Sequence, residues 1–167
     1  MPLVKGGRIV EDRFVRVLDD APVPEGVPVL LPAARLIADA HDLVERQAPT
    51  GVIWPNDRKI AELAPFLDRL ALVALVFPTF RDGRAYSQAR LIRERHQFRG
   101  ELRATGQVLR DQLLFLQRAG FDAFELTKVA DAAAFAAAVH RYSVFYQPAA
   151  DGRASTLTAR LARAPQH

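Results

Sequence analysis

The sequence predicts an α/β fold in a single domain, built from successive βα units around a mostly parallel sheet. Short apolar runs of strand length alternate with amphipathic stretches of helix length, which is the pattern of βα units. The ends of the predicted strands also recur at nearly even intervals. Because 167 residues are too few for a full eight-unit barrel of about 250 residues, an open sheet or a partial (β/α) barrel remains.

The strand candidates are short runs rich in apolar and β-branched residues. Residues Arg8 to Leu18 alternate in polarity and predict a hairpin added at a sheet edge. The run LVALVF has no polar interruption, as expected for a strand covered by helices on both faces, so we place it at the sheet centre. In chain order the remaining candidates are Val29–Leu31, Gly51–Trp54, Leu72–Phe77, Glu101–Ala104, Ala123–Leu126 and Val144–Tyr146.

The helix candidates carry apolar residues at helical spacing. Ala85, Ala89, Ile92 and His96 recur on one side of the third candidate and should face the sheet. Gly120 supplies the left-handed residue that ends the fourth. The candidates are Ala33–Arg46, Asp57–Leu70, Arg84–Arg95, Gln107–Ala119 and Val129–Arg141.

We therefore expect one α/β domain over residues 1–148, of which 1–27 form the edge hairpin and a lead-in, followed by a polar tail over 149–167. The longest apolar run, Leu70 to Phe77, is far shorter than the roughly 20 residues of a membrane-spanning helix. Charges at Lys5 and Glu11 fall where a signal peptide would need its apolar core. These features predict a cytoplasmic protein with no membrane association.

The charge distribution points to an anionic ligand or partner. The chain has 23 Lys and Arg against 19 Asp and Glu, and the positive excess falls between Arg81 and Arg118. A local excess indicates an anion or an acidic partner met there. The alternative is that these arginines only solvate helix surfaces. The stretch lacks a recognisable nucleic-acid-binding module, which argues against nucleic acid.

The loop after the central strand is the first candidate anion site. Asp82 and Gly83 form a turn signal, and Arg84 offers a bidentate fork suited to an oxyanion. Ser87 adds a hydroxyl in the first turn of the following helix, whose start has free backbone amides. The competing interpretation is that Asp82 caps this helix and pairs with Arg84.

Two neighbouring strands add charged residues. Glu101 and Arg103 lie on one face of their strand, and charges on a central strand are costly unless they are paired or functional. Gly106 would let a ligand approach the backbone closely, and Glu125 ends the next strand. Because the carboxyl ends of parallel strands meet at one rim, we expect these residues to join Arg84 in one small-oxyanion site. Glu101 and Glu125 would be proton acceptors or ion-pair partners of Arg103.

Several familiar chemistries have no signal in the chain. The absence of cysteine excludes thiol nucleophiles, thiol redox pairs and cysteine-ligated metal centres. No glycine-rich dinucleotide fingerprint, phosphate loop or GxSxG motif occurs, and the four histidines lack metal-ligand spacing. No cofactor or metal is therefore indicated by motif.

Residues 77–126 contain the blocks FPTFRDGR, GELRATG and GFDAFEL. This stretch resembles the bacterial family named domain of unknown function 934. The resemblance is looser before Leu72, with PVLLP and GVIWPNDRK at the expected places, and it does not cover the tail. Gln107 stands where the family pattern has Asp. Members are labelled as oxidoreductases involved in sulfite reduction, so the resemblance implies a part in sulfur assimilation.

Three functions stay open from the sequence. The first is an auxiliary protein of assimilatory sulfite reduction with a small-oxyanion site at the carboxyl rim of the sheet. The second is a non-catalytic module that docks on sulfite reductase or its electron donor. The third is a partial-barrel lyase or isomerase, and whether the chain is an enzyme is left undecided. Two partial barrels could also pair as a homodimer. The docking surface would comprise Arg90, Arg93, Arg95 and Arg99.

Overall fold

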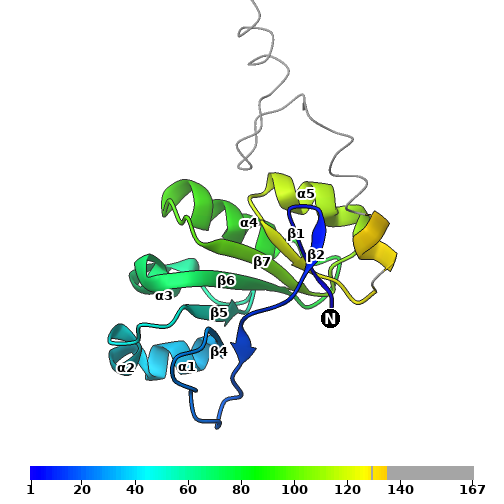
Figure 1. Cartoon of the computed structure of the whole chain (residues 1–167). Helices are drawn as coiled ribbons and strands as arrows, with labels where there is room; N and C mark the ends of the chain where they lie inside the picture. The colour runs from blue at the N-terminus through cyan, green and yellow to red at the C-terminus, as the bar shows by residue number, and fades with distance from the viewer. Residues whose placement is uncertain (129, 135–167) are drawn as a thin grey trace, which may run out of the picture.

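The computed structural model describes residues 1–128 and 130–134, and within them an eight-stranded sheet organises the fold (Figure 1). The strand order is β2-β1-β8-β7-β6-β5-β4-β3. Strands β3 to β8 are parallel neighbours in chain order, whereas β1 pairs antiparallel with β8 and β2 with β1. The predicted α/β class and mostly parallel sheet are confirmed, with antiparallel pairs at one edge. The strands are β1 Leu3–Lys5, β2 Arg8–Val10, β3 Val15–Arg16, β4 Val29–Pro32, β5 Thr50–Trp54, β6 Leu70–Phe77, β7 Glu101–Gly106 and β8 Ala123–Glu125.

The predicted helix Arg84–Arg95 is confirmed as α4 (Arg84–Arg90) continued by the π-helical turn η2 (Leu91–Arg95), whereas the first two helices differ from the prediction. The first breaks at Asp39 into two pieces. The second ends early because a 3₁₀ turn that contains Pro65 begins at Ala64 and because Leu70 already belongs to β6. The helices are α1 Ala33–Ala38, α2 Ala40–Val44, α3 Ile60–Leu63, α4 Arg84–Arg90 and α5 Leu113–Arg118, with 3₁₀ turns η1 Ala64–Arg69 and η3 Arg110–Gln112 and the π-helical turn η2 Leu91–Arg95.

Two predicted elements fall wholly or mostly outside the described residues. These are the strand Val144–Tyr146 and the helix Val129–Arg141, of which residues 130–134 are seen as helix. The tail over 149–167 also lies outside. Among the described helices, none has the length and apolar character needed to cross a membrane.

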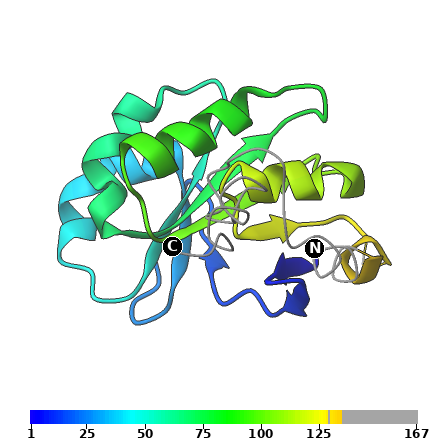
Figure 2. The same ribbon diagram turned by 90° about the horizontal axis from the view of Figure 1, so that it is seen from above.

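The main core lies between the helices and one face of the sheet. Helices α1 to α5 are arranged around the outside of the curled sheet (Figure 2). Ala85, Ala89 and Ile92 are fully buried on this side, as their spacing predicted, whereas His96 is only half-buried. Gly120, with φ +102°, takes the left-handed conformation expected beyond the end of α5. The sheet and helix residues of this core include Val52, Trp54, Val73, Leu75, Phe77, Leu102, Ala104, Leu113, Leu116 and Phe124.

The opposite, inner face of the sheet is covered differently from the prediction. Leu30, Leu72 and Ala74 form a separate cluster there, and the partly buried Phe14 packs against it. The run LVALVF is therefore central but is covered by helices on only one face. Its second face is apolar because the sheet curls and the N-terminal segment lies across it.

The N-terminal segment also corrects the predicted hairpin. The turn between β1 and β2 is made by Gly6 and Gly7, both at positive φ (57° and 74°), which suits a two-residue hairpin turn. The chain then leaves β2 at Val10 and enters β3 at Val15, at the opposite edge of the sheet. Residues 11–14, called here the crossing segment, make that passage.

This passage requires a strongly curled sheet. Eight flat strands would span about 34 Å from first to last at the usual spacing of about 4.8 Å. The chain from Val10 to Val15 can extend at most about 18 Å. The two edges must therefore approach each other, so the sheet is a half-barrel with the crossing segment over its open side.

Candidate functional site

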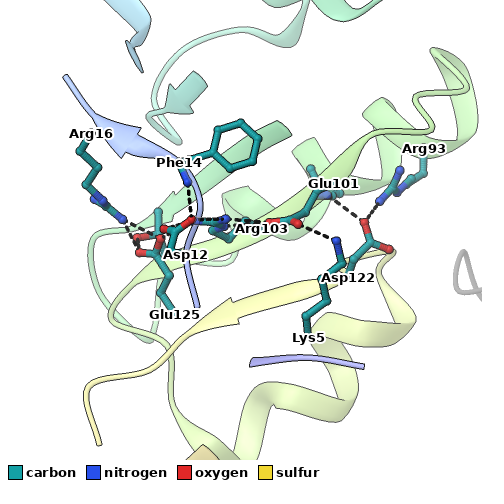
Figure 3. A network of polar contacts seen from close by, with 11 residues as sticks. Lys5, Asp12, Phe14, Arg16, Arg93, Glu101, Arg103, Asp122 and Glu125 are labelled. Atoms are coloured by element: carbon teal, nitrogen blue, oxygen red, sulfur yellow. Dashed lines mark hydrogen bonds and ion pairs between the residues drawn. The ribbon is translucent and has the colours of Figure 1, made fainter. Parts of the chain in front are cut away.

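The inner face of the half-barrel holds a network of ionised side chains (Figure 3). We call it the inner-face network. It joins strands β1, β7 and β8 to the crossing segment and β3, which are far apart in sequence. Three carboxylates face three cations, so the group is balanced in charge. Its members are Lys5, Asp12, Arg16, Glu101, Arg103 and Glu125, with Thr105 beside them.

Arg103 is the centre of the inner-face network and is only 1% exposed. Its Nη1 lies 2.7 Å from Asp12 Oδ2 and 3.0 Å from Glu125 Oε1, and its Nη2 lies 2.9 Å from Glu101 Oε1. The ring of Phe14 lies over the guanidinium, 5.9 Å from Cζ to the ring centroid. Every nitrogen of this guanidinium thus faces a carboxylate of the chain itself.

Glu125 is equally engaged and is buried. Arg16 donates to both of its carboxylate oxygens, Arg103 donates to Oε1, and the Thr105 hydroxyl donates to Oε2. Burial alone would raise the pKa of Glu125, but the hydrogen bonds from Thr105 and Arg16 and the nearby positive charges outweigh it, so the pKa lies below its ordinary value. A carboxylate held ionised in this way is a weak general base.

The pKa values of Asp12 and Arg103 are set by the same balance between burial and ion pairing. Burial would raise the pKa of Asp12, but its hydrogen bonds with Arg103 and the Phe14 amide lower the pKa overall. Burial would lower the pKa of Arg103, but the carboxylates of Asp12 and Glu101 raise it. All three groups therefore stay charged, and their mutual contacts hold the crossing segment against the sheet.

The structure does not bring all of the predicted anion-site residues together. Arg103 lies on the inner face, whereas α4 packs on the outer face through Ala85 and Ala89, so the sheet separates Arg103 from Arg84. Gly106, at the end of β7, has φ +92°, and a Cβ there would come within 2.5 Å of the Phe77 carbonyl oxygen. The role of Gly106 that the structure shows is close backbone packing against β6.

In the DGR loop, made of Asp82, Gly83 and Arg84, the side chain of Asp82 pairs with Arg84. This pairing was the competing interpretation of the loop. Arg84 donates to Asp82 from its backbone amide and from Nε and Nη2, with Nη2 2.6 Å from Oδ2. These hydrogen bonds hold the pKa of Asp82 well below its usual range. Gly83 precedes the first residue of α4. Arg84 is nevertheless exposed and, with Ser87, lines an open pocket.

This α3–α4 pocket has a volume of about 520 Å³ and lies between the loop after β5, helix α3 and helix α4. No carboxylate is among its lining residues. Glu62 lies 3.4 Å from Arg58 and Asp82 pairs with Arg84, but no described carboxylate pairs with Lys59 or Arg95. The residues that line it are Asn56, Arg58, Lys59, Ile60, Ala61, Ala64, Arg84, Ser87, Gln88, Leu91, Arg95 and His96.

Two buried residues of this pocket each have a side-chain atom without a hydrogen-bond partner, Nδ2 of Asn56 and Oε1 of Gln88. Gln88 is 6% exposed, and its Nε2 donates to the carbonyl oxygens of Pro55 (3.2 Å) and Arg58 (2.9 Å). Those two acceptors fix which end of the amide is nitrogen. Its Oε1 has no hydrogen-bond partner. A buried acceptor without a partner is costly, which makes it a marker of an absent ligand or water.

The backbone beside the pocket is irregular as well. Residues Leu91–Arg95 continue α4 as a π-helical turn, a feature found often at functional sites. Gln97, just beyond it, has φ +54°, which non-glycine residues seldom adopt. The π turn carries Leu91 and Arg95, both of which line the pocket.

The four arginines of the predicted docking surface serve different purposes. Arg93 donates to the carbonyl oxygens of Phe98, Gly100 and Gly120 and pairs with Asp122. It therefore fixes the connection between η2 and β7. Arg90, Arg95 and Arg99 are exposed, and Arg95 lines the α3–α4 pocket.

In the part of the chain that the structure describes, no group of histidine, aspartate and glutamate side chains is arranged to hold a metal ion. Of the residues that line the α3–α4 pocket, the sequence analysis named Arg84 and Ser87 for an anion site and Arg95 for a docking surface, but it missed Lys59 and Gln88. A signal for Lys59 did exist, since the polar segment PNDRK follows β5 at the same rim as the DGR loop follows β6. For Asp12 there was none, because 91 residues separate it from Arg103.

The chain matches the model of a known protein family. The model of a family described as a bacterial protein of unknown function, DUF934, matches residues 51–157. The match includes β5 to β8 and the whole α3–α4 pocket, and it leaves out the crossing segment. No curated protein matches the chain.

Proposed function

Because the chain belongs to DUF934, a bacterial family of unknown function, we propose its function from the site itself: it is an auxiliary protein that binds an oxyanion in the α3–α4 pocket. The sulfite-reduction label noted with the sequence resemblance makes sulfite the first oxyanion to test. In this proposal the chain binds the anion and the redox chemistry belongs to a partner. The absence of cysteine agrees with that division, since the chain has no thiol to oxidise.

The observation that carries the proposal is the unpaired positive charge of the pocket. Lys59 and Arg95 line it from two different segments, and no described carboxylate neutralises either. Arg84 and Ser87 add a guanidinium and a hydroxyl on α4. Charge-assisted hydrogen bonds from such groups are the usual means of holding sulfite, sulfate or phosphate.

The two other functions have less support from the geometry. A lyase or isomerase would need a carboxylate able to take a proton, but Glu125 has a lowered pKa and its oxygens already accept hydrogen bonds from Arg16, Arg103 and Thr105. Docking through four arginines would lose Arg93, which is engaged within the fold.

Isothermal titration calorimetry at low ionic strength tests the proposal. Sulfite, sulfate and phosphate are titrated into the full chain and into a Lys59→Met, Arg95→Met double variant. We expect binding of at least one oxyanion to the wild type and about tenfold weaker binding to the double variant, which corresponds to about 1.4 kcal/mol. Added salt should weaken the wild-type interaction.

Arg90→Met is the matched control. Arg90 is exposed on α4, the helix that carries Arg84 and Ser87, but it does not line the pocket. Its loss should therefore leave the oxyanion affinity within twofold of the wild type. If no oxyanion binds to the wild type, or if the double variant and the control bind equally well, the proposed function is wrong.

A further inference from the structure

We infer that the ligand of the α3–α4 pocket is an organic oxyanion, a phosphate or sulfate ester whose body carries a hydrogen-bond donor. This inference rests on the proposed function and names the class of ligand. Three properties of the pocket support it, namely its size, its apolar wall and the unpaired acceptor of Gln88.

The volume of the pocket is too large for an inorganic ion alone. At about 520 Å³ it falls within the range of about 300–1,000 Å³ that is typical of small-molecule sites. A bare sulfite or phosphate would fill the space of only a few waters, each with a share of about 30 Å³. Most of the pocket would then remain filled with water.

The lining is divided between charge and apolar surface. Ile60 and Ala61 of α3, Ala64 of η1 and Leu91 of η2 contribute an apolar wall beside the cations. An inorganic ion gains nothing from such a surface, whereas the body of an ester can bury apolar area against it. Leu91 is 43% exposed, so this part of the wall is open to solvent.

The unpaired Oε1 of Gln88 calls for a hydrogen-bond donor on the ligand. The Gln88 amide is held by its two hydrogen bonds to Pro55 and Arg58, so Oε1 cannot exchange places with Nε2 without facing two carbonyl oxygens. Sulfate, which is fully ionised, has no hydrogen to offer this atom. An N–H or O–H group on the body of the ligand would satisfy it.

A matched set of probes separates these contributions by calorimetry. Inorganic phosphate presents the anion alone, phenyl phosphate adds an apolar body, and 4-aminophenyl phosphate adds a donor to that body. We expect phenyl phosphate to bind at least tenfold more tightly than inorganic phosphate, and the amino group to improve the affinity a further threefold or more.

Two variants locate the effect in the pocket. Ala61→Phe fills the apolar side, so phenyl phosphate should bind no more tightly than inorganic phosphate, whose own affinity stays within twofold. Gln88→Met keeps the length of the side chain but removes the acceptor together with the hydrogen bonds to Pro55 and Arg58. It should abolish the advantage of the amino group, measured as the ratio of 4-aminophenyl phosphate to phenyl phosphate affinity within the same variant. Thermal melting of each variant confirms that it is folded.

The outcomes distinguish this inference from the proposed function. If inorganic phosphate binds and requires Lys59 and Arg95, but phenyl phosphate binds no better, the ligand class is wrong while oxyanion binding stands. If the amino group has no effect on the wild type, the role of Gln88 is wrong. If none of these probes binds and sulfite and sulfate do not bind either, both proposals fail.

Discussion

Replacement of Arg103 by Met should destabilise the protein strongly, because it removes the cation that three carboxylates share. The side chain is 1% exposed and contacts Asp12, Glu101 and Glu125 at 2.7, 2.9 and 3.0 Å. Met preserves much of the apolar stem, so the main change is the loss of charge and of hydrogen bonds.

The magnitude follows from the partners that remain. Breaking a buried ion pair typically costs about 3–5 kcal/mol because a charge is left without compensation. Lys5 still neutralises Glu101 and Arg16 still neutralises Glu125, so we expect the lower end, about 3 kcal/mol. For a chain of this size that corresponds to a fall in melting temperature of about 6–12 °C.

The pH dependence of stability gives a second test of the role of Arg103. Asp12 and Glu125 have lowered pKa values in the folded protein, so they contribute stability above their ordinary pKa values and lose it as the pH falls through the folded ones. The wild type should therefore lose stability progressively as the pH falls below about 5. In Arg103→Met the carboxylates are less stabilised as anions, so the difference between variant and wild type should narrow from pH 7 to pH 4.

The assay is thermal unfolding followed by circular dichroism at pH 7 and pH 4, with trypsin digestion as a local readout. Arg13 is exposed in the crossing segment, and cleavage after it should accelerate in the variant because Asp12 no longer holds that segment. Arg84→Met, which removes an exposed ion pair, should change neither measurement appreciably. A melting temperature within 2 °C of the wild type for Arg103→Met at pH 7 would refute the reasoning.

Further predictions concern single contacts and can be checked by the same unfolding measurement. Thr105→Val keeps the shape of a β-branched residue but removes the hydroxyl that donates to Glu125, and it should cost about 1–2 kcal/mol. Gly106→Ala should cost about 2–3 kcal/mol, since φ is +92° and the new Cβ would meet the Phe77 carbonyl oxygen at 2.5 Å. Gly26→Ala is its control, with positive φ but open space, and should cost only about 1 kcal/mol. Phe14→Ala removes a half-buried ring from the inner face, so about 2 kcal/mol and faster tryptic cleavage of the crossing segment are expected.

The parallel part of the fold could be predicted because its signals are local. The strands β4, β5 and β6 are mostly apolar runs, and the periodicity of Ala85, Ala89 and Ile92 identifies the buried side of α4. The direction of the N-terminal segment could not be predicted in the same way. β3 contains only Val15 and Arg16, both exposed, and its place beside β4 depends on the curl of the whole sheet.

The candidate site was predictable only in part for a related reason. Alternation correctly placed Glu101 and Arg103 on one face, and their ion pair was one of the open alternatives. The rim rule groups residues by the end of the strand at which they lie, but it does not say whether they face inward or outward. Arg103 lies within β7 and points to the inner face, whereas Arg84 begins a helix on the outer one.

The separation of the inner-face network from the α3–α4 pocket makes stability and binding independent observables in this chain. Substitution of Arg103 should lower stability without altering oxyanion affinity in molecules that remain folded, because the sheet lies between it and the pocket. Substitution of Lys59 and Arg95 should weaken oxyanion binding without lowering stability, since neither residue has a described carboxylate partner to lose. A variant of Arg103 that stayed folded but bound the oxyanion tenfold more weakly would show that the two faces communicate, and the division of roles argued here would then fail.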